Sequence, residues 1–165
     1  MKKRKKGVNL DYEKILTHLA PCGLDCSKCF AYSEGEIKLI SRILERFLGS
    51  FDIYAETFSK ILSVFANYSS FKVLLSYLAQ SDYLGCRRGT CKYPNCGVIG
   101  CHKMKGVDFC FQCDEFPCEK TNFDSDLKRR WIQMNNRMKE IGVEAYYEET
   151  KDLPRYKWQH KFLLL

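Results

Sequence analysis

The chain has 165 residues and a mass of 19.4 kDa, which is enough for one domain and too little for a barrel of eight strands and eight helices. Its composition, 45% hydrophobic and 14% aromatic, is typical of a folded protein. The sequence contains no run of eighteen apolar residues, so no membrane-spanning helix is predicted. The formal net charge is +7, but five positive charges lie in residues 2–6, so the rest of the chain carries only +2. The ten cysteines are the unusual feature, and they direct the interpretation.

Residues 1–9 are expected to form a basic, disordered tail. The run of Lys and Arg at its start resembles the beginning of a signal peptide, but Asp11, Glu13 and Lys14 interrupt any apolar stretch after it. We therefore expect a cytoplasmic protein, whose thiols stay reduced. In that compartment ten cysteines indicate metal-bound thiolates rather than disulfides.

Apolar residues at helical spacing predict several helices in chain order. A first helix is expected from Asp11 until Pro21, and three more between 36 and 80. The first of these three has a capping-box pattern at Ser33–Glu36 and a terminator at Gly49. Their apolar stripes are interpreted as plain core of a small helical bundle: Ile37, Ile40, Ile43, Leu44, Phe47, Leu48, Phe58, Ile61, Leu62, Phe65, Val73, Leu74, Tyr77 and Leu78.

A longer helix is expected to open at Asp124 or Ser125 and to end at Gly142, followed by a short helix over 143–151. The terminal residues 162–165 are apolar and are expected to dock on the body. The predicted fold class is mainly α, a small helical bundle with an irregular cysteine-rich metal-binding segment. One helical domain is expected over 10–165, with cysteine clusters at 22–29 and 86–118.

The segment 86–118 holds seven cysteines, little apolar periodicity and many Gly and Pro residues, so it cannot order itself by burial alone. Bound metal can supply the missing stability, and cysteines two to four residues apart can reach one ion from a single turn. Three thiolates in 22–29 leave a tetrahedral site one ligand short, and 86–118 is the obvious donor of the fourth. We therefore expect the two clusters to lie close in space.

About two zinc ions are predicted, because eight to ten thiolates divide into sites of four. Cys91 is the cysteine most readily left out of the set of metal ligands, since a free Cys is often a small buried hydrophobic residue. His102 could replace a thiolate, although a hydrogen-bonded or exposed histidine is favoured. The predicted metal ligands are Cys22, Cys26, Cys29, Cys86, Cys96, Cys101, Cys110, Cys113 and Cys118.

An iron–sulfur cluster is the alternative cofactor, because thiolates hold such clusters too, but the ferredoxin run C-x2-C-x2-C-x3-C-P is absent. The C-x3-C-x2-C spacing of 22–29 occurs in radical enzymes that bind S-adenosylmethionine. Those enzymes usually place an aromatic residue where this chain has Lys28, and they need a larger barrel. No nucleophile elbow, phosphate-binding loop or H-E-x-x-H motif is present, so no catalytic residue is named and an enzymatic role stays open.

The cysteine clusters carry recognisable runs. In the first half the run is Ala20-Pro21-Cys22-Gly23-Leu24-Asp25-Cys26-Ser27-Lys28-Cys29-Phe30-Ala31-Tyr32. In the second half the runs are Gly85-Cys86-Arg87, Asn95-Cys96 to Cys101, Lys105-Gly106-Val107 and Cys110-Phe111-Gln112-Cys113-Asp114-Glu115-Phe116-Pro117-Cys118.

These runs resemble those of the DUF3795 proteins, a prokaryotic family of unknown function. The resemblance covers about residues 18–145 and implies a small cysteine-rich protein that binds metal, with no established activity. The family often has a Cys three residues before the position of Cys86, where this chain has Tyr83, so either Cys91 compensates or that site is altered.

The sequence favours a binding or adaptor protein stapled by structural zinc, with an unknown protein partner on its helical side. The alternative is an iron–sulfur or redox protein, or an accessory to an enzyme. Nucleic-acid binding through residues 2–6, Arg87, Arg88 and 128–130 is weakly supported, and no membrane partner is expected.

Overall fold

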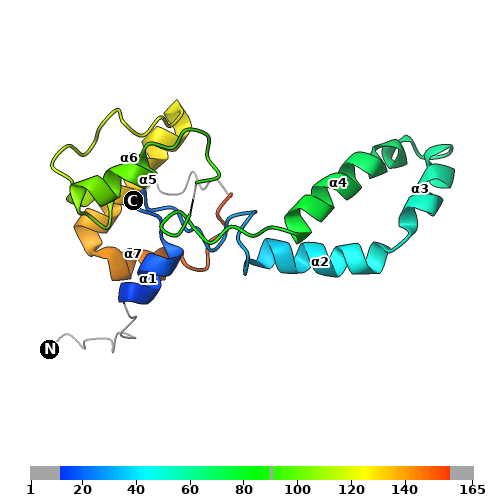
Figure 1. Ribbon diagram of the computed structural model, residues 1–165, viewed down its shortest axis with the longest axis horizontal. Helices are drawn as coiled ribbons and strands as arrows, with labels where there is room; N and C mark the ends of the chain where they lie inside the picture. Colours follow the sequence, from blue (N-terminus) through cyan, green and yellow to red (C-terminus); the bar gives the residue numbers. More distant parts are fainter. Residues whose placement is uncertain (1–11, 90, 157–165) are drawn as a thin grey trace, which may run out of the picture. The chain divides into compact units, whose positions relative to one another are not determined.

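The computed structural model describes residues 12–89 and 91–156. Within these residues the chain forms seven α-helices, two short 3-10 helices and no strand (Figure 1). Backbone pairing outside the helices is limited there to two isolated bridges, Leu19 with Asp25 and Tyr32 with Tyr83. The predicted helical fold class is confirmed. None of the described helices combines the length and apolar character that a membrane crossing requires. The predicted basic tail and the docking of 162–165 concern residues outside the described ranges.

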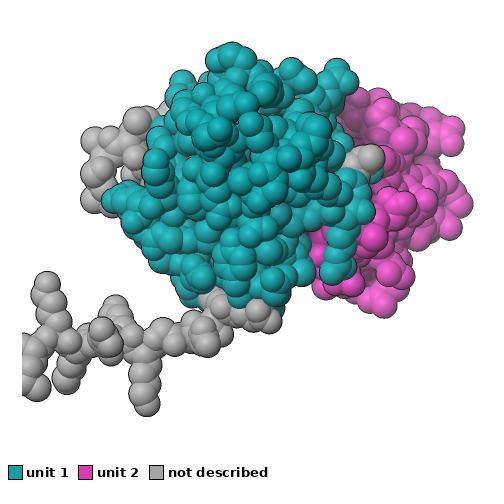
Figure 2. Space-filling model, turned by 60° about the vertical axis from the view of Figure 1, so that its left-hand side comes forward, with its two compact units in different colours: residues 1–26, 85–165 teal, residues 27–84 magenta. Residues whose placement is uncertain are grey.

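The chain divides into two compact units (Figure 2). We call residues 27–84 the helical unit, and residues 1–26 with 85–165, which hold nine of the ten cysteines, the cysteine unit. The single domain expected over 10–165 stays a prediction.

The cysteine unit contains α1 (Tyr12–His18), α5 (Val98–Lys105), η2 (Cys110–Gln112), α6 (Ser125–Ile141) and α7 (Val143–Thr150). Its apolar core joins α1, α6, α7 and the start of η2, and it consists of Ile15, Leu19, Phe109, Met138, Val143, Tyr146 and Tyr147.

Helix α6 begins and ends where the sequence predicts. The Asp124 carboxylate accepts hydrogen bonds from the backbone N–H groups of Asp126 and Leu127 at 3.0 and 2.9 Å, which satisfies two donors that a helix start leaves open. At the other end Gly142, with φ +88°, donates to the Met138 carbonyl at 3.0 Å.

The helical unit contains α2 (Glu36–Leu48), α3 (Phe51–Ser59), η1 (Ser63–Asn67) and α4 (Tyr68–Ala79). Helix α2 packs along α4, and the Phe51 ring contacts the rings of Phe58, Phe65 and Tyr68 at centroid distances of 5.3 to 6.3 Å. These aromatic contacts hold α3 and η1 against the start of α4. The predicted capping box at Ser33 is wrong, because α2 starts at Glu36 with Gly35 as its cap.

The interpretation of the apolar stripes as plain core is also wrong for most of their residues. Ile40, Ile43, Leu44 and Phe47 of α2 are exposed, and Val73, Leu74 and Tyr77 of α4 are exposed too. The buried residues of these helices are Ser41, Leu75 and Ala79. Two packed helices offer each other only one face, so the remaining apolar surface stays uncovered within the unit.

Candidate metal centre

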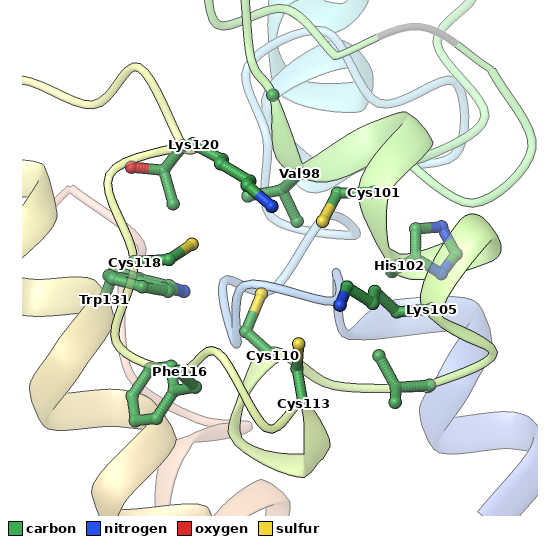
Figure 3. Close-up of a pocket in the computed structure, with 13 residues that line it drawn as sticks. Val98, Cys101, His102, Lys105, Cys110, Cys113, Phe116, Cys118, Lys120 and Trp131 are labelled. Carbon is green, nitrogen blue, oxygen red and sulfur yellow. The ribbon is translucent and has the colours of Figure 1, made fainter.

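Four cysteines line one cavity of about 30 Å³ in the cysteine unit. Cys101 comes from α5, Cys110 from η2, Cys113 from the residue after η2, and Cys118 from the segment that leads to α6. Their sulfur atoms point into a common space (Figure 3). The centre is thus assembled from separate short elements, none of which could form it alone.

Gly97 allows α5 to lie against the segment that carries Cys118. Its N–H donates to the Thr121 carbonyl at 3.1 Å, and a Cβ at position 97 would lie 1.8 Å from the carbonyl oxygen of Lys120. No side chain fits this approach, so the glycine sets the separation between Cys101 and Cys118.

The buried side chain of Asn135 joins the two cysteine clusters. Its Nδ2 donates to the carbonyls of Cys22 and Trp131 at 3.0 Å, and its Oδ1 accepts the Phe111 N–H at 3.0 Å. The Cys110 N–H adds a bond to the Pro21 carbonyl at 2.9 Å. The expected closeness of the two clusters is therefore confirmed for Cys22. The sequence analysis missed Asn135, whose signal is a polar residue between Trp131 and Met138 on the apolar face of α6.

Two lysines also line the cavity. Lys105 and Lys120 donate to opposite oxygens of the Glu115 carboxylate at 2.7 and 2.5 Å, and these bonds lower the pKa of Glu115 to about 2. Figure 3 shows both ammonium groups directed toward the sulfur atoms. The two lysines and the Glu115 carboxylate that they share carry one net positive charge, which would partly offset the negative charge of a thiolate site.

Trp131 presents an unsatisfied donor to the same cavity. Burial raises the pKa of Cys110 to about 11, while the neighbouring indole N–H of Trp131 acts in the opposite direction. The Nε1 atom of Trp131 is buried and makes no hydrogen bond of good geometry within the described residues. The Nε2 atom of His102 is buried and unpaired in the same way there. A thiolate at Cys110 would give the indole N–H the acceptor that it lacks. The His102 ring lies to one side of the four sulfur atoms, and burial lowers its pKa.

Cys86, Cys91 and Cys96 form a second group of thiols. Hydrogen bonds from the side chains of Cys86 and Cys96 lower the pKa of Cys91 to about 3, and the Tyr93 N–H donates to Cys91 Sγ at 3.4 Å. The hydrogen bond between Cys96 and Cys91, together with burial, raises the pKa of Cys96. Cys91, which the sequence analysis left out of the ligand set, is thus the central thiol of this group.

The three cysteines of the first cluster are all buried. Burial raises the pKa of Cys22 to about 12, and the thiols of Cys26 and Cys110 lie near enough to add to the rise. Arg87 holds this loop by donating to the carbonyls of Leu19 at 3.0 Å and Asp108 at 2.7 Å. Cys29 belongs to the helical unit.

The donor set fits a soft metal, because four thiols converge on the cavity and zinc and iron–sulfur clusters both take thiolates. No disulfide joins the ten cysteines, all of which are described. Within the described part of the chain, however, no three side chains of His, Cys, Asp or Glu lie in a ready-made metal site. A bound ion would have to draw the thiols together, and the nine-residue ligand set stays a prediction.

Comparison with known proteins gives one result. The family model described as "Protein of unknown function (DUF3795)" matches residues 18–123, from the end of α1 to the segment before α6. No curated protein and no solved structure matches the chain. The match covers both cysteine clusters and more than half of the sequence, and the chain therefore belongs to the DUF3795 family.

Proposed function

We propose that the protein is a metal-binding adaptor in which Cys101, Cys110, Cys113 and Cys118 hold one structural zinc ion. The observation that carries this proposal is the convergence of four sulfur atoms from separate segments on one small cavity. A tetrahedral site closed by four thiolates leaves no position for substrate, so the ion serves the fold.

The charges around the cavity support the proposal. A divalent ion with four thiolates carries a net charge of −2, which is costly next to buried apolar groups. Lys105 and Lys120 line the cavity and, with the Glu115 carboxylate that they share, carry one net positive charge, and Trp131 supplies a buried N–H. Such outer groups stabilise bound thiolates and hold them in place.

A second zinc ion is proposed at Cys86, Cys91 and Cys96, with a fourth thiolate from the first cluster. Cys22 is the best candidate because it lies close enough to Cys96 for its charge to raise the pKa of Cys96. The side chains of Cys86 and Cys96 each hydrogen-bond to Cys91, which supports a site at these residues. Two ions agree with the number expected from ten cysteines.

Zinc is preferred to an iron–sulfur cluster because the ferredoxin run C-x2-C-x2-C-x3-C-P is absent and the four thiols come from separate short elements. Zinc takes four thiolates in a closed tetrahedral site, and four cysteines line the cavity.

Elemental analysis of the full chain, purified without oxygen, tests the metal proposal. We expect a colourless protein with about two zinc ions per chain. Cys113→Ser should lose one ion and Cys91→Ser the other, so that each variant is the matched control of its counterpart. A brown protein with iron and sulfide contradicts the zinc assignment, and a folded protein without metal contradicts both cofactors.

A protein partner is proposed in preference to nucleic acid, because four of the five basic side chains named for nucleic acid within the described residues are engaged within the protein. Arg87 and Arg130 donate to backbone carbonyls, Arg129 pairs with Asp126 at 2.8 Å, and Lys128 pairs with Glu119. Phosphate contacts would have to compete with these bonds. The cytoplasmic location, on which reduced thiols depend, stays a prediction.

A further inference from the structure

Among the described residues, most of the large apolar side chains that are exposed lie in the helical unit. Of the eighteen that are exposed among the described residues, sixteen lie between 27 and 84. Five of these are aromatic, and they alone expose on the order of 500 Å², if a full ring side chain presents about 200 Å². This exposed aromatic area is spread over α2, α3 and α4, and such exposure in a small unit is a sign of an interaction surface. The five are Phe47, Tyr54, Phe58, Phe71 and Tyr77.

Helix α2 carries a continuous part of this surface. Ile40, Ile43, Leu44 and Phe47 recur at i, i+3, i+4 and i+7, the spacing of a face that packs on another helix. Phe47 is 76% exposed, whereas Ser41 on another face of α2 is 5% exposed. We call the residues 39, 40, 43, 44 and 47 the α2 stripe.

The charges of the helical unit fit pairing with itself. It contains six acidic and six basic residues, so its net charge is zero and the basic excess lies elsewhere in the chain. It therefore has no net attraction for anionic membranes or nucleic acid, and no net repulsion from a second copy.

The ends of the α2 stripe favour an antiparallel pair. Glu36 stands one turn before Ile40 on the same face, and Arg46, whose guanidinium lies 5.3 Å from the Phe47 ring centroid, flanks the other end. In an antiparallel pair each Glu36 comes toward the partner's Arg46 end, whereas a parallel pair brings like charges together. Opposed helix dipoles favour the same orientation.

We propose that two copies of this chain pair through their α2 stripes, so that two α2–α4 hairpins form a four-helix bundle. A stable interface buries about 800 Å² on each side, which the aromatic and aliphatic side chains of the unit supply together. A bundle of four helices also gives each apolar stripe the cover that a hairpin alone lacks. The proposal is independent of the bound metal.

Sedimentation equilibrium of the full, metal-containing chain tests the dimer from about 1 to about 100 µM, a range in which weak homodimers dissociate. We expect twice the mass of one chain and, for the double variant Ile43→Glu with Phe47→Glu, a dimer weaker by at least about a hundredfold. Met104→Glu is the matched control, since Met104 is 84% exposed in the cysteine unit and should leave the dimer intact.

Charge reversal tests the orientation without changing the apolar stripe, and so keeps the test valid should the double variant lose helicity. Glu36→Lys and Arg46→Glu should each weaken the dimer, and the two together should restore it. Additive weakening by the two changes contradicts the antiparallel pair. A monomeric wild type, including one that binds vesicles of neutral lipid, or a double variant that is helical and still dimeric, overturns the proposal.

Discussion

Asn135 has no exposed surface and satisfies backbone groups of three segments that meet at the metal centre. Asn135→Leu would leave the Phe111 N–H and the Cys22 carbonyl buried without a partner. Each such group costs about 1–3 kcal/mol, so we expect a loss of about 2–6 kcal/mol in the free energy of unfolding. Urea unfolding of the metal-loaded protein measures this loss. Asn136→Leu is the control, because Asn136 is exposed and should change stability by less than about 0.5 kcal/mol.

Trp131 is expected to stabilise bound metal through its indole N–H. Trp131→Phe keeps a ring of similar shape but removes the donor to the Cys110 thiolate, and the loss of a group that orients a ligand typically weakens metal binding about 10- to 100-fold. Competition with a coloured chelator measures the affinity. Phe123→Leu controls for packing, since the Phe123 ring contacts Trp131 at a centroid distance of 6.3 Å and carries no N–H. Equal affinities in wild type and Trp131→Phe would show that the indole contributes only its bulk.

At this scale the sequence predicts chemistry better than it predicts position. Ten cysteines indicate thiolate ligation, and the pocket gathers four of the predicted ligands. Cys91 was left out of the predicted ligands, although it was named as a possible replacement for a cysteine at Tyr83, because its contact with Cys86 and Cys96 depends on how an irregular loop folds. Asn135 was missed for the same reason: its partners lie 24 and 113 residues away.

At the scale of elements, the start of α5 depends on a residue without a side chain. Gly97→Ala would place a Cβ 1.8 Å from the Lys120 carbonyl oxygen, and backbone must move to admit it. We expect a loss of about 1–3 kcal/mol in stability and weaker metal binding, because Cys101 and Cys118 move apart. Gly100→Ala in the same helix is the control: no atom lies within 4 Å of its added Cβ, and alanine favours a helix by about 1 kcal/mol. We therefore expect the free energy of unfolding to fall for Gly97→Ala and to rise for Gly100→Ala.

The helices themselves were largely predictable, whereas their surroundings were not. Asp124 and Gly142 mark the ends of α6 because capping chemistry is local in the sequence. The stripe of α2 was read correctly as a helical face, but periodicity does not say whether that face meets core, solvent or a second molecule. Only the structure shows that Ile40 and Phe47 are exposed.

At the scale of the whole molecule, the two units should respond differently to the removal of metal. The helical unit holds one cysteine and packs through α2, α4 and the rings around Phe51, so its helices should persist. Segment 86–118 is expected to depend on bound metal, which contributes on the order of 10 kcal/mol in small thiolate sites. Hydrogen exchange after chelation should show faster exchange in 86–118 and little change in 36–79. Unchanged protection of 86–118 after proven metal removal would show that packing holds that segment.

The pH dependence of stability should reverse when metal is removed. In the metal-free reduced protein, burial raises the pKa of Cys22 to about 12 and that of Cys110 to about 11, above the ordinary value of 9.0. Between pH 9 and 11 the unfolded chain therefore releases protons that the folded chain keeps, and each thiol lowers stability by about 1.4 kcal/mol per pH unit. The stability that Cys22 and Cys110 contribute is thus retained below pH 9 and lost as the pH rises.

Metal binding requires thiolates, so in the metal-loaded protein protons compete with the ion and stability falls as the pH falls. Urea midpoints at pH 6, 8 and 10 measure both forms. We expect the midpoint of the loaded protein to rise from pH 6 to 8 and that of the metal-free protein to fall from pH 8 to 10. Cys110→Ser is the control for the metal-free series. Serine does not titrate in this pH range, so the urea midpoint should fall less between pH 8 and 10, by the contribution of one thiol. A metal-free protein as stable at pH 10 as at pH 8 would mean that these thiols are not buried when the ion is absent.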